Sequence, residues 1–258
     1  MKKINDNFEK LFPKEKAIVM LHAHADDESF LSAGIINEFV TRDYNILLIY
    51  LATGLVDGDN RPILRQKELF SALELLGVQN VDLLKYCEPK YLKNGKPLYL
   101  QSIQEVIEGI KTSIRKRGIK EYILFSYDKN GGYGNRDHLV VHKVGRLLLK
   151  NSSNLSSLFE VTFPREIYLD WFLKKEGKVS ENYLPKLSYW SKEFGLVNNE
   201  IDYVYSLNII QVDKKRNALS KHQSQIQKDE FPLTLTDVDF QKLFGKEYFS
   251  YLGRSIAE

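Results

Sequence analysis

Short apolar runs alternate along the chain with longer stretches in which apolar positions recur every three or four residues. Four runs have the length of a strand and are almost entirely apolar: 17–21, 45–51, 81–84 and 121–125. Four stretches have helical periodicity: 29–42, 62–76, 101–117 and 137–150. Continuously apolar strands that alternate with helices predict an α/β fold, with a mostly parallel sheet and helices on both of its faces.

The second half of the chain has weaker patterns. Residues 151–157 are polar and turn-like, which favours a surface loop or a weak linker. Residues 159–171 predict one or two strands, 203–212 a strand and 214–227 a polar-faced helix. No internal repeat or low-complexity tract interrupts the pattern. We therefore expect a single domain over the whole chain, with its core at 17–227 and an elaborated C-terminal half.

Composition narrows the class of protein. The net charge of +3 over 258 residues is too small to indicate nucleic-acid binding. A single cysteine, Cys87, excludes an intrachain disulfide and indicates a reducing compartment. Residues 1–16 contain no apolar stretch of signal-peptide length, and no apolar run is long enough to cross a membrane. We expect a cytoplasmic protein that does not insert into membranes, and the composition is compatible with a homo-oligomer.

A polar cluster, His24-Ala-Asp-Asp-Glu-Ser29, follows the first apolar run. A water-activating metal site needs a nitrogen ligand, an oxygen ligand and a further carboxylate as base, and this cluster contains all three. Taken alone, its acids and Ser29 are as typical of a helix N-terminus. The metal interpretation therefore needs a second group of ligands elsewhere in the chain.

The loop 127–138 supplies that second group. It contains three glycines, which allow the backbone conformations and close approaches that a ligand site requires, and it ends in Asp137-His138. It also follows the last of the four apolar runs. Because ligands in parallel α/β folds bind at the carboxyl ends of the strands, we expect this loop and the first cluster to share one site.

Three residues of these two segments form a candidate metal site. His24, Asp27 and His138 would leave one position open for water, which is typical of a catalytic zinc site. Two histidines and a carboxylate also suit iron(II). The additional carboxylate of Asp26 fits hydrolysis better than oxygen chemistry, so zinc is the expected cofactor and iron(II) the second choice.

Two motifs resemble those of a known family: His24-Ala-Asp-Asp-Glu28 and Asn135-Arg-Asp-His138. They are similar to the His-Pro-Asp-Asp-Glu and His-Pro-Asp-His motifs of the zinc-dependent N-acetylglucosaminyl deacetylases of the LmbE/PIG-L family. Arg65-x-x-Glu68 and Lys215-x-x-Ala-x-x-x-His222-x-Ser-Gln225 also match. The resemblance covers about 17–227 and implies a Rossmann-like sheet.

Carried over position by position, the resemblance implies a complete hydrolytic site. The roles it implies are zinc ligation by His24, Asp27 and His138, general base catalysis by Asp26, orientation of catalytic groups by Asp137, a position over the substrate carbonyl for Tyr133, and substrate binding by Arg65 and His222.

Two positions depart from the family pattern. Ala25 stands where the family has proline, which costs the loop only some stiffness. Asn135 stands where the second motif has histidine, and an amide can donate a hydrogen bond but cannot supply a proton at neutral pH. We therefore expect Tyr133, Asn135 and the metal to share the stabilisation of the oxyanion, with Asp26 carrying the proton.

The expected reaction is hydrolysis of an N-acetyl group on a small amino-sugar conjugate of the N-acetylglucosamine type. Trp171, Tyr189 and Trp190 are available to stack on a sugar ring. Two alternatives remain open: a related amidase acting on a thiol or glycoside conjugate, and a catalytically impaired sugar- or nucleotide-binding module, which Asn135 makes plausible. No Gly-x-Gly-x-x-Gly follows the first strand, so dinucleotide binding is rejected.

Overall fold

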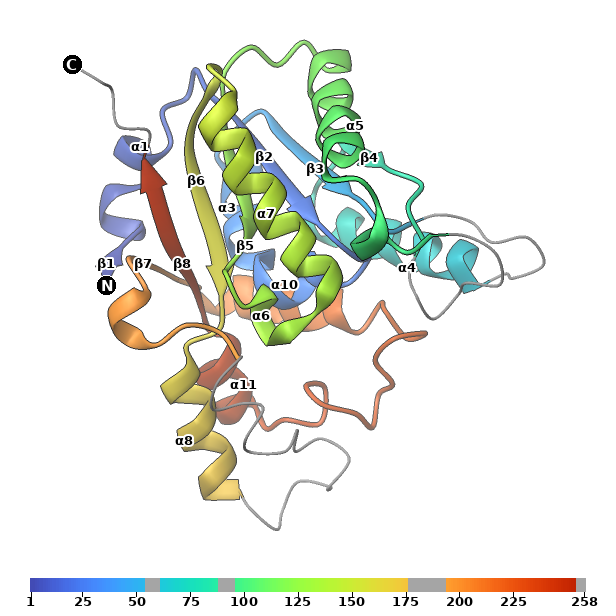
Figure 1. Cartoon of the computed structure of the whole chain (residues 1–258). Coiled ribbons are helices and arrows are strands. Elements are labelled where there is room, and N and C mark those ends of the chain that lie inside the picture. The colour runs from blue at the N-terminus through green and yellow to red at the C-terminus, as the bar shows by residue number, and fades with distance from the viewer. Residues whose placement is uncertain (54–60, 88–95, 176–193, 254–258) are drawn as a thin grey trace.

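The computed structural model describes residues 1–53, 61–87, 96–175 and 194–253. Within these ranges one eight-stranded sheet runs through the molecule in the order β1-β7-β8-β6-β5-β2-β3-β4 (Figure 1). The strands are β1 (Lys2–Lys3), β2 (Ala17–His22), β3 (Ile46–Tyr50), β4 (Val81–Leu83), β5 (Tyr122–Tyr127), β6 (Leu155–Thr162), β7 (Tyr203–Ser206) and β8 (Lys246–Gly253). Strand β8 is antiparallel to both of its neighbours, and all other pairs are parallel. The predicted mostly parallel α/β sheet is confirmed.

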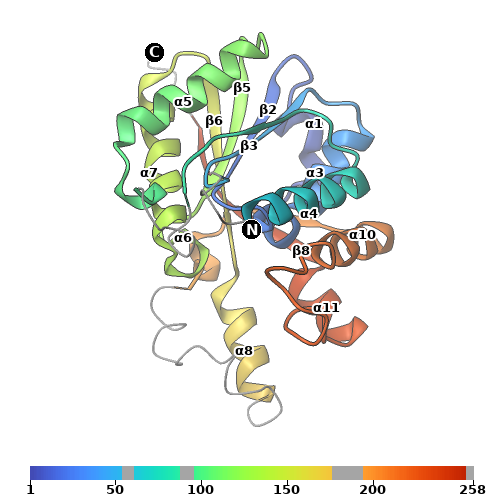
Figure 2. The same ribbon diagram turned by 90° about the vertical axis from the view of Figure 1, so that its right-hand side faces the viewer.

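Helices cover both faces of the sheet. The α-helices are α1 (Phe8–Leu11), α2 (Asp27–Leu31), α3 (Ala33–Thr41), α4 (Arg61–Leu76), α5 (Ile103–Lys116), α6 (Gly131–Gly134), α7 (Arg136–Asn151), α8 (Arg165–Lys175), α10 (Ile209–Leu219) and α11 (Asp237–Phe244). Short 3₁₀ turns are η1 (Asn5–Asn7), η3 (Leu98–Leu100) and η5 (Asn198–Glu200). Figure 2 shows α5 and α7 on one side of the sheet, and α3, α4 and α10 on the other.

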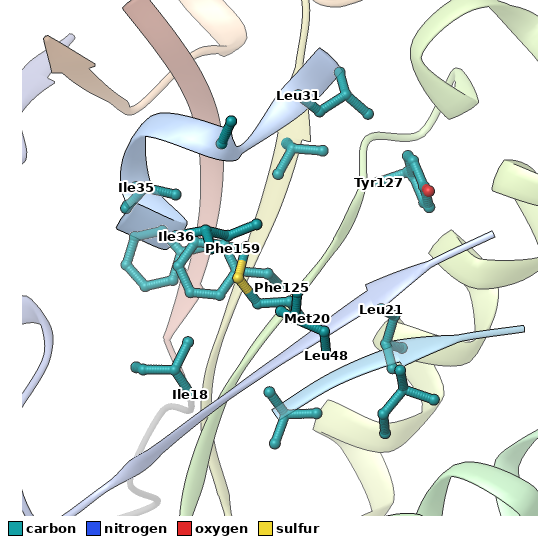
Figure 3. Close-up of a cluster of buried hydrophobic side chains, with 14 of the residues drawn as sticks. Ile18, Met20, Leu21, Leu31, Ile35, Ile36, Leu48, Phe125, Tyr127 and Phe159 are labelled. Atoms are coloured by element: carbon teal, nitrogen blue, oxygen red, sulfur yellow. The ribbon is translucent and has the colours of Figure 1, made fainter. Parts of the chain in front are cut away.

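The four predicted strands of the first half form within two residues of their expected bounds. Every residue of β2, β3 and β5 is buried, as continuous apolar runs in a two-sided sheet require. Side chains from β2, β5, β6 and α3 meet in the core shown in Figure 3. The rings of Phe125 and Phe159 stack there, with centroids 5.1 Å apart.

The stretch 29–42 was predicted as one helix, and the structure divides it into α2 and α3 at Ser32. The cause is a contact from a distant strand. The Glu247 carboxylate of β8 accepts hydrogen bonds from the backbone N–H groups of Gly34 and Ile35, at 2.8 and 2.9 Å. It thereby satisfies the free donors at the start of α3, which no local side chain caps.

Three predictions for the second half are wrong in part. Strand β6 begins at Leu155, inside the expected loop, and the expected strands of 159–171 give way to α8 after Pro164. The expected strand 203–212 ends at Ser206, and α10 begins at Ile209 instead.

The apolar pair Ile209-Ile210 explains the last of these errors. Both side chains lie on the surface, with 69% and 64% of their area exposed, so a helix start was mistaken for a buried strand. Asn208 and Gln211 form a reciprocal capping box there. The helix also ends earlier than predicted, at Leu219.

The carboxyl edge of the parallel strands carries the extra helices. Strand β6 leads into α8, and α11 leads into the antiparallel β8, so both helices lie at this edge and extend below the sheet in Figures 1 and 2. The loops after β2 and β5 open at the same edge. Among the described residues, no helix is both long enough and apolar enough to cross a membrane.

Candidate active site

The two sequence motifs meet in the folded chain. His24, Asp27 and His138 are all buried, and one ligand atom of each lies within 4.8 Å of the others. His138 Nε2 is 3.3 Å from His24 Nδ1, across 114 positions of sequence, and also 3.3 Å from Asp27 Oδ1. Tetrahedral ligands at about 2.0–2.1 Å from zinc lie about 3.3 Å apart. The donor set therefore fits a zinc-sized ion.

Backbone and side-chain contacts hold Asp27 in this cluster. Asp27 Oδ2 accepts a hydrogen bond from the His24 backbone N–H, at 2.8 Å, and from the Tyr127 hydroxyl, at 2.5 Å. The same hydroxyl accepts from the Ala23 N–H, so Tyr127 at the end of β5 ties down the loop that follows β2. Burial alone would raise the pKa of Asp27, but the imidazoles of His138 and His24 and the Tyr127 hydroxyl outweigh it and lower the pKa.

Each histidine has one ring nitrogen bonded away from the cluster. His138 Nδ1 lies 3.0 Å from the Gly131 carbonyl oxygen, and His24 Nε2 lies 3.0 Å from Asp137 Oδ2. Both partners are acceptors, so each holds the ring proton on its own side. The other ring nitrogens, His24 Nδ1 and His138 Nε2, lie 3.6 and 3.3 Å from the Asp27 carboxylate oxygens. The predicted orienting residue, Asp137, thus contacts His24 rather than its sequence neighbour.

Glycine is required where the loop passes the second histidine. Gly131 has φ of +59°, and a Cβ atom there would lie 3.0 Å from His138 Cβ. Asn135 begins α7 and its Oδ1 accepts hydrogen bonds from the N–H groups of Asp137 and His138, at 2.8 and 3.4 Å. This capping role was missed at the sequence level, although asparagine is a preferred N-cap residue. The predicted oxyanion role of Asn135 stays a prediction.

Asp26 sits beside the cluster in a strained conformation. Its φ is 142°, a region that residues other than glycine rarely adopt, and such strain costs about 1–3 kcal/mol. One fifth of its side chain is exposed, and Arg65 Nη2 lies 3.4 Å from Oδ1. Burial raises the pKa of Asp26 to about 6, although the charge of Arg65 acts in the opposite direction. Arg65 also donates to the Ala25 carbonyl oxygen at 2.7 Å, which holds this turn in place.

A buried ion pair lies behind Asp26. His222 is completely buried, and its Nε2 is 2.8 Å from Glu28 Oε1. Burial by itself raises the pKa of Glu28, but the charge and hydrogen bond of His222 lower it to about 2. The structure thus places the sequence-predicted His222 against Glu28, and it is not among the side chains that line the cavity beside Asp26. Its predicted contact with substrate stays a prediction.

A cavity of about 340 Å³ opens next to the two aspartates. Its lining consists of Asp26, Asp27, Phe30, Leu31, Tyr133, Phe163, Tyr168, Phe194, Phe231 and Phe244. Tyr133 is 40% exposed. Its ring makes an edge-to-face contact with the His138 ring, and the two centroids are 5.2 Å apart. Trp171 is buried, donates to Asp239, and is not among the residues that line the cavity. Tyr189 and Trp190 lie outside the described residues.

Comparison with known proteins places this site in context. A family model described as PIG-L, GlcNAc-PI de-N-acetylase, matches residues 19–149, about half of the chain. The chain is 27% identical over 148 residues to 1D-myo-inositol 2-acetamido-2-deoxy-alpha-D-glucopyranoside deacetylase of Corynebacterium glutamicum, covering 49% of this chain and 50% of that protein. It is 26% identical over 156 residues to mycothiol S-conjugate amidase of Streptomyces coelicolor, covering 53% of each. It therefore spans about half the length of these curated relatives.

The fold is also similar to solved structures. The zinc-inhibited form of teicoplanin deacetylase superposes with a TM-score of 0.64 at 14% identity, covering 94% of this chain and all of that one. At this identity the likeness establishes the arrangement of helices and strands. The site is therefore interpreted from this chain's own residues.

Proposed function

Because the chain belongs to the PIG-L family of GlcNAc-PI de-N-acetylases, we propose that it is a metal-dependent hydrolase that removes an N-acetyl group from an amino-sugar conjugate. The observation that carries this proposal is the cluster of His24, Asp27 and His138 with Asp26 at its edge, open to a cavity. A ligand set with one further carboxylate as base is the minimal equipment for hydrolysis of an amide.

We propose zinc as the ion, with iron(II) as the second choice. The set of two imidazole nitrogens and one carboxylate oxygen suits either ion, and one ligand atom of each of the three residues lies within 4.8 Å of the others. When bound, such an ion polarises the amide carbonyl and lowers the pKa of a water molecule.

Asp26 is the proposed general base. A carboxyl with a pKa of about 6 is ionised at neutral pH, yet basic enough to accept a proton from the attacking water. The water oxygen bonds to the carbonyl carbon, the C–N bond breaks, and Asp26 returns the proton to the amine nitrogen as acetate leaves. Arg65 holds the Asp26 turn and favours the ionised carboxylate.

The oxyanion requires donors on the opposite side of the reacting carbon. Tyr133 lines the cavity beside Asp27, and its hydroxyl is the proposed donor from this chain. The Asn135 amide is proposed as a second donor, because only its carbonyl oxygen is used in capping α7. Neither group replaces the proton that a histidine would supply at that position.

Two other functions stay open. The similarity to an amidase favours a related reaction on a thiol or glycoside conjugate, with the same base and ligands. Asn135 favours a sugar- or nucleotide-binding module that binds metal without turnover.

The test combines metal analysis with product release. The purified protein is assayed for zinc and iron, and acetate and free amine are measured from N-acetylglucosamine glycosides and from amide conjugates of thiols. Asp26→Asn is expected to lower kcat about 10²- to 10⁴-fold without loss of metal. Asp6→Asn, which changes an exposed aspartate, is the matched control.

The outcomes separate the three functions. Release of acetate from the glycosides supports the deacetylase, and release of amine from the thiol conjugates alone supports the amidase. Metal binding without turnover, together with ligand affinity that Asp26→Asn does not change, supports the binding module. Absence of both bound metal and product would overturn all three functions, because the binding module is also expected to hold metal.

A further inference from the structure

The cavity beside Asp26 and Asp27 has a lining that a bare amino sugar does not need. We propose that it binds an apolar group attached to the scissile amide, so that preferred substrates carry an aromatic or medium-length alkyl substituent. The identity of the reacting bond rests on the proposed function. The apolar binding site rests on the cavity itself.

The lining is apolar beyond the reacting end. Apart from the two aspartates, its described side chains are seven aromatic rings and Leu31. The Tyr168 hydroxyl donates to the Leu243 carbonyl oxygen at 3.2 Å, so it is already satisfied. Each sugar hydroxyl buried against such a wall without a partner weakens binding. An alkyl or aryl group buried there incurs no such cost, because transfer of apolar surface from water is favourable.

The aromatic rings of the lining pack against one another. Phe163 and Phe194 stack with centroids 5.0 Å apart, and Tyr168 packs on Phe194 at 5.2 Å. The centroids of Phe231 and Phe244 are 5.9 Å apart, and those of Phe244 and Tyr168 are 6.2 Å apart. Rings that support one another in this way keep their positions without a ligand, so the cavity is preformed.

The wall is also joined to the catalytic loop. The Gly195 N–H donates to the Gly132 carbonyl oxygen at 2.6 Å, and the Asn130 amide donates to the Gly195 carbonyl oxygen at 2.7 Å. These bonds fix Phe194 relative to the glycine loop that leads into His138. Phe30, which also lines the cavity, lies three residues after Asp27 in α2. An amide held at the aspartates therefore has a substituent directed along these walls.

The size of the cavity sets the size of the group. An apolar cavity of roughly 150 Å³ holds one benzene molecule. The volume of about 340 Å³ is more than twice that. An acetyl methyl group would leave most of this space unfilled, whereas a hexyl or phenyl group fits. The group can belong to the acyl part or to the amine part of the amide, and the experiment has an arm for each.

Binding is measured first, because it does not depend on turnover. The Asp26→Asn protein is titrated by calorimetry with three compounds: the methyl and hexyl glycosides of N-acetylglucosamine, and the methyl glycoside of N-hexanoylglucosamine. Each buried methylene strengthens binding about four-fold. One of the two long-chain compounds, the hexyl glycoside or the N-hexanoyl compound, is therefore expected to bind at least ten-fold more tightly than the methyl glycoside of N-acetylglucosamine, with a more negative heat-capacity change. Equal affinities of all three would overturn the inference.

A matched pair of variants assigns the preference to this cavity. Phe231→Ser places a hydroxyl in the lining, and Phe70→Ser makes the same change at a side chain on α4 that is 50% exposed and does not line the cavity. Phe231→Ser is expected to remove most of the ten-fold preference, and Phe70→Ser is expected to leave it unchanged. Loss of the preference in both variants, or in neither, would contradict the assignment. If Phe231→Ser fails to fold, the comparison of the three compounds still decides.

Rates on the unaltered protein separate this inference from the proposed function. Hydrolysis of the methyl glycoside of N-acetylglucosamine at the same kcat/KM as both long-chain compounds would support the proposed function and overturn the apolar site. Tighter binding of a long-chain compound, without hydrolysis of any of the three, would support the apolar site and overturn the proposed function.

Discussion

The hydrogen bonds of Asp137 offer a sharp test of how the site is prepared for metal. Asp137 Oδ1 accepts from the Tyr99 backbone N–H at 2.9 Å, and Oδ2 faces His24 Nε2 at 3.0 Å. In Asp137→Asn, one of the two oxygens becomes an NH₂ group, which donates and cannot accept. If this group faces His24, the ring proton must move to Nδ1, the nitrogen that faces Asp27. If it faces Tyr99, the amide NH₂ and the Tyr99 backbone N–H are two donors that face each other without an acceptor.

The magnitude follows from this conflict. A buried backbone N–H without its acceptor costs about 1–3 kcal/mol. Loss of the acceptor that orients a ligating histidine weakens metal binding about 10- to 100-fold, or roughly 1.4–2.7 kcal/mol. We expect Asp137→Asn to bind zinc about 10- to 100-fold more weakly than the unaltered protein, whichever orientation the amide takes.

The assay is competition for zinc between the metal-free protein and a chromogenic chelator. Asp6→Asn is the control for an exposed aspartate, and the melting temperature of each metal-free protein reports folding. Zinc affinity that is unchanged in Asp137→Asn would refute the tautomer argument. Absence of zinc binding in the unaltered protein would refute the ligand assignment itself.

Three further predictions concern strain, a buried charge and pH. Asp26→Gly relieves the φ of 142° and is expected to be about 1 kcal/mol more stable than Asp26→Asn. This difference corresponds to a melting temperature about 2–4 °C higher for Asp26→Gly than for Asp26→Asn. A melting temperature of Asp26→Gly that is equal or lower would argue against strain. Lys215→Met leaves the Glu247 carboxylate, now 2.7 Å from Lys215 Nζ, without its cation. It is expected to cost about 3–5 kcal/mol in urea unfolding, and a cost below 1 kcal/mol would contradict a buried pair. Burial by itself raises the pKa of Glu160. Hydrogen bonds from His142 and Arg146 outweigh this effect, and the pKa falls below the ordinary 4.5. The stability from this group is therefore present above pH 4.5 and lost as pH falls below it, so Glu160→Gln should flatten the acid decline of the melting temperature.

Much of the fold could be read from local pattern. The strands of the first half are short and apolar throughout, and this pattern requires no knowledge of distant residues. The second half was harder because burial there depends on tertiary contacts. Ile209 and Ile210 have the pattern of strand residues but lie on a helix surface. The segment after residue 227, outside the predicted core, supplies the interior strand β8.

The candidate site was also partly readable. His24, Asp27 and His138 are chemically suited to one metal, and the rule that ligands bind at the carboxyl ends of strands predicted that they meet. The roles that the sequence proposed for Tyr133, Asn135 and His222 stay predictions. The sequence analysis missed that Asn135 caps α7 and that His222 pairs with Glu28.

The sequence by itself therefore determined the strand–helix alternation and the residues that can bind metal, because periodicity and side-chain chemistry are local properties. Only the tertiary structure decided which acceptor lies against each histidine, and the burial that raises the pKa of Asp26. It also assembled the aromatic cavity, from segments as far apart as Phe30 and Phe244. These features depend on distances between groups that no spacing along the chain specifies, because they exist only once the sheet has brought its carboxyl ends together.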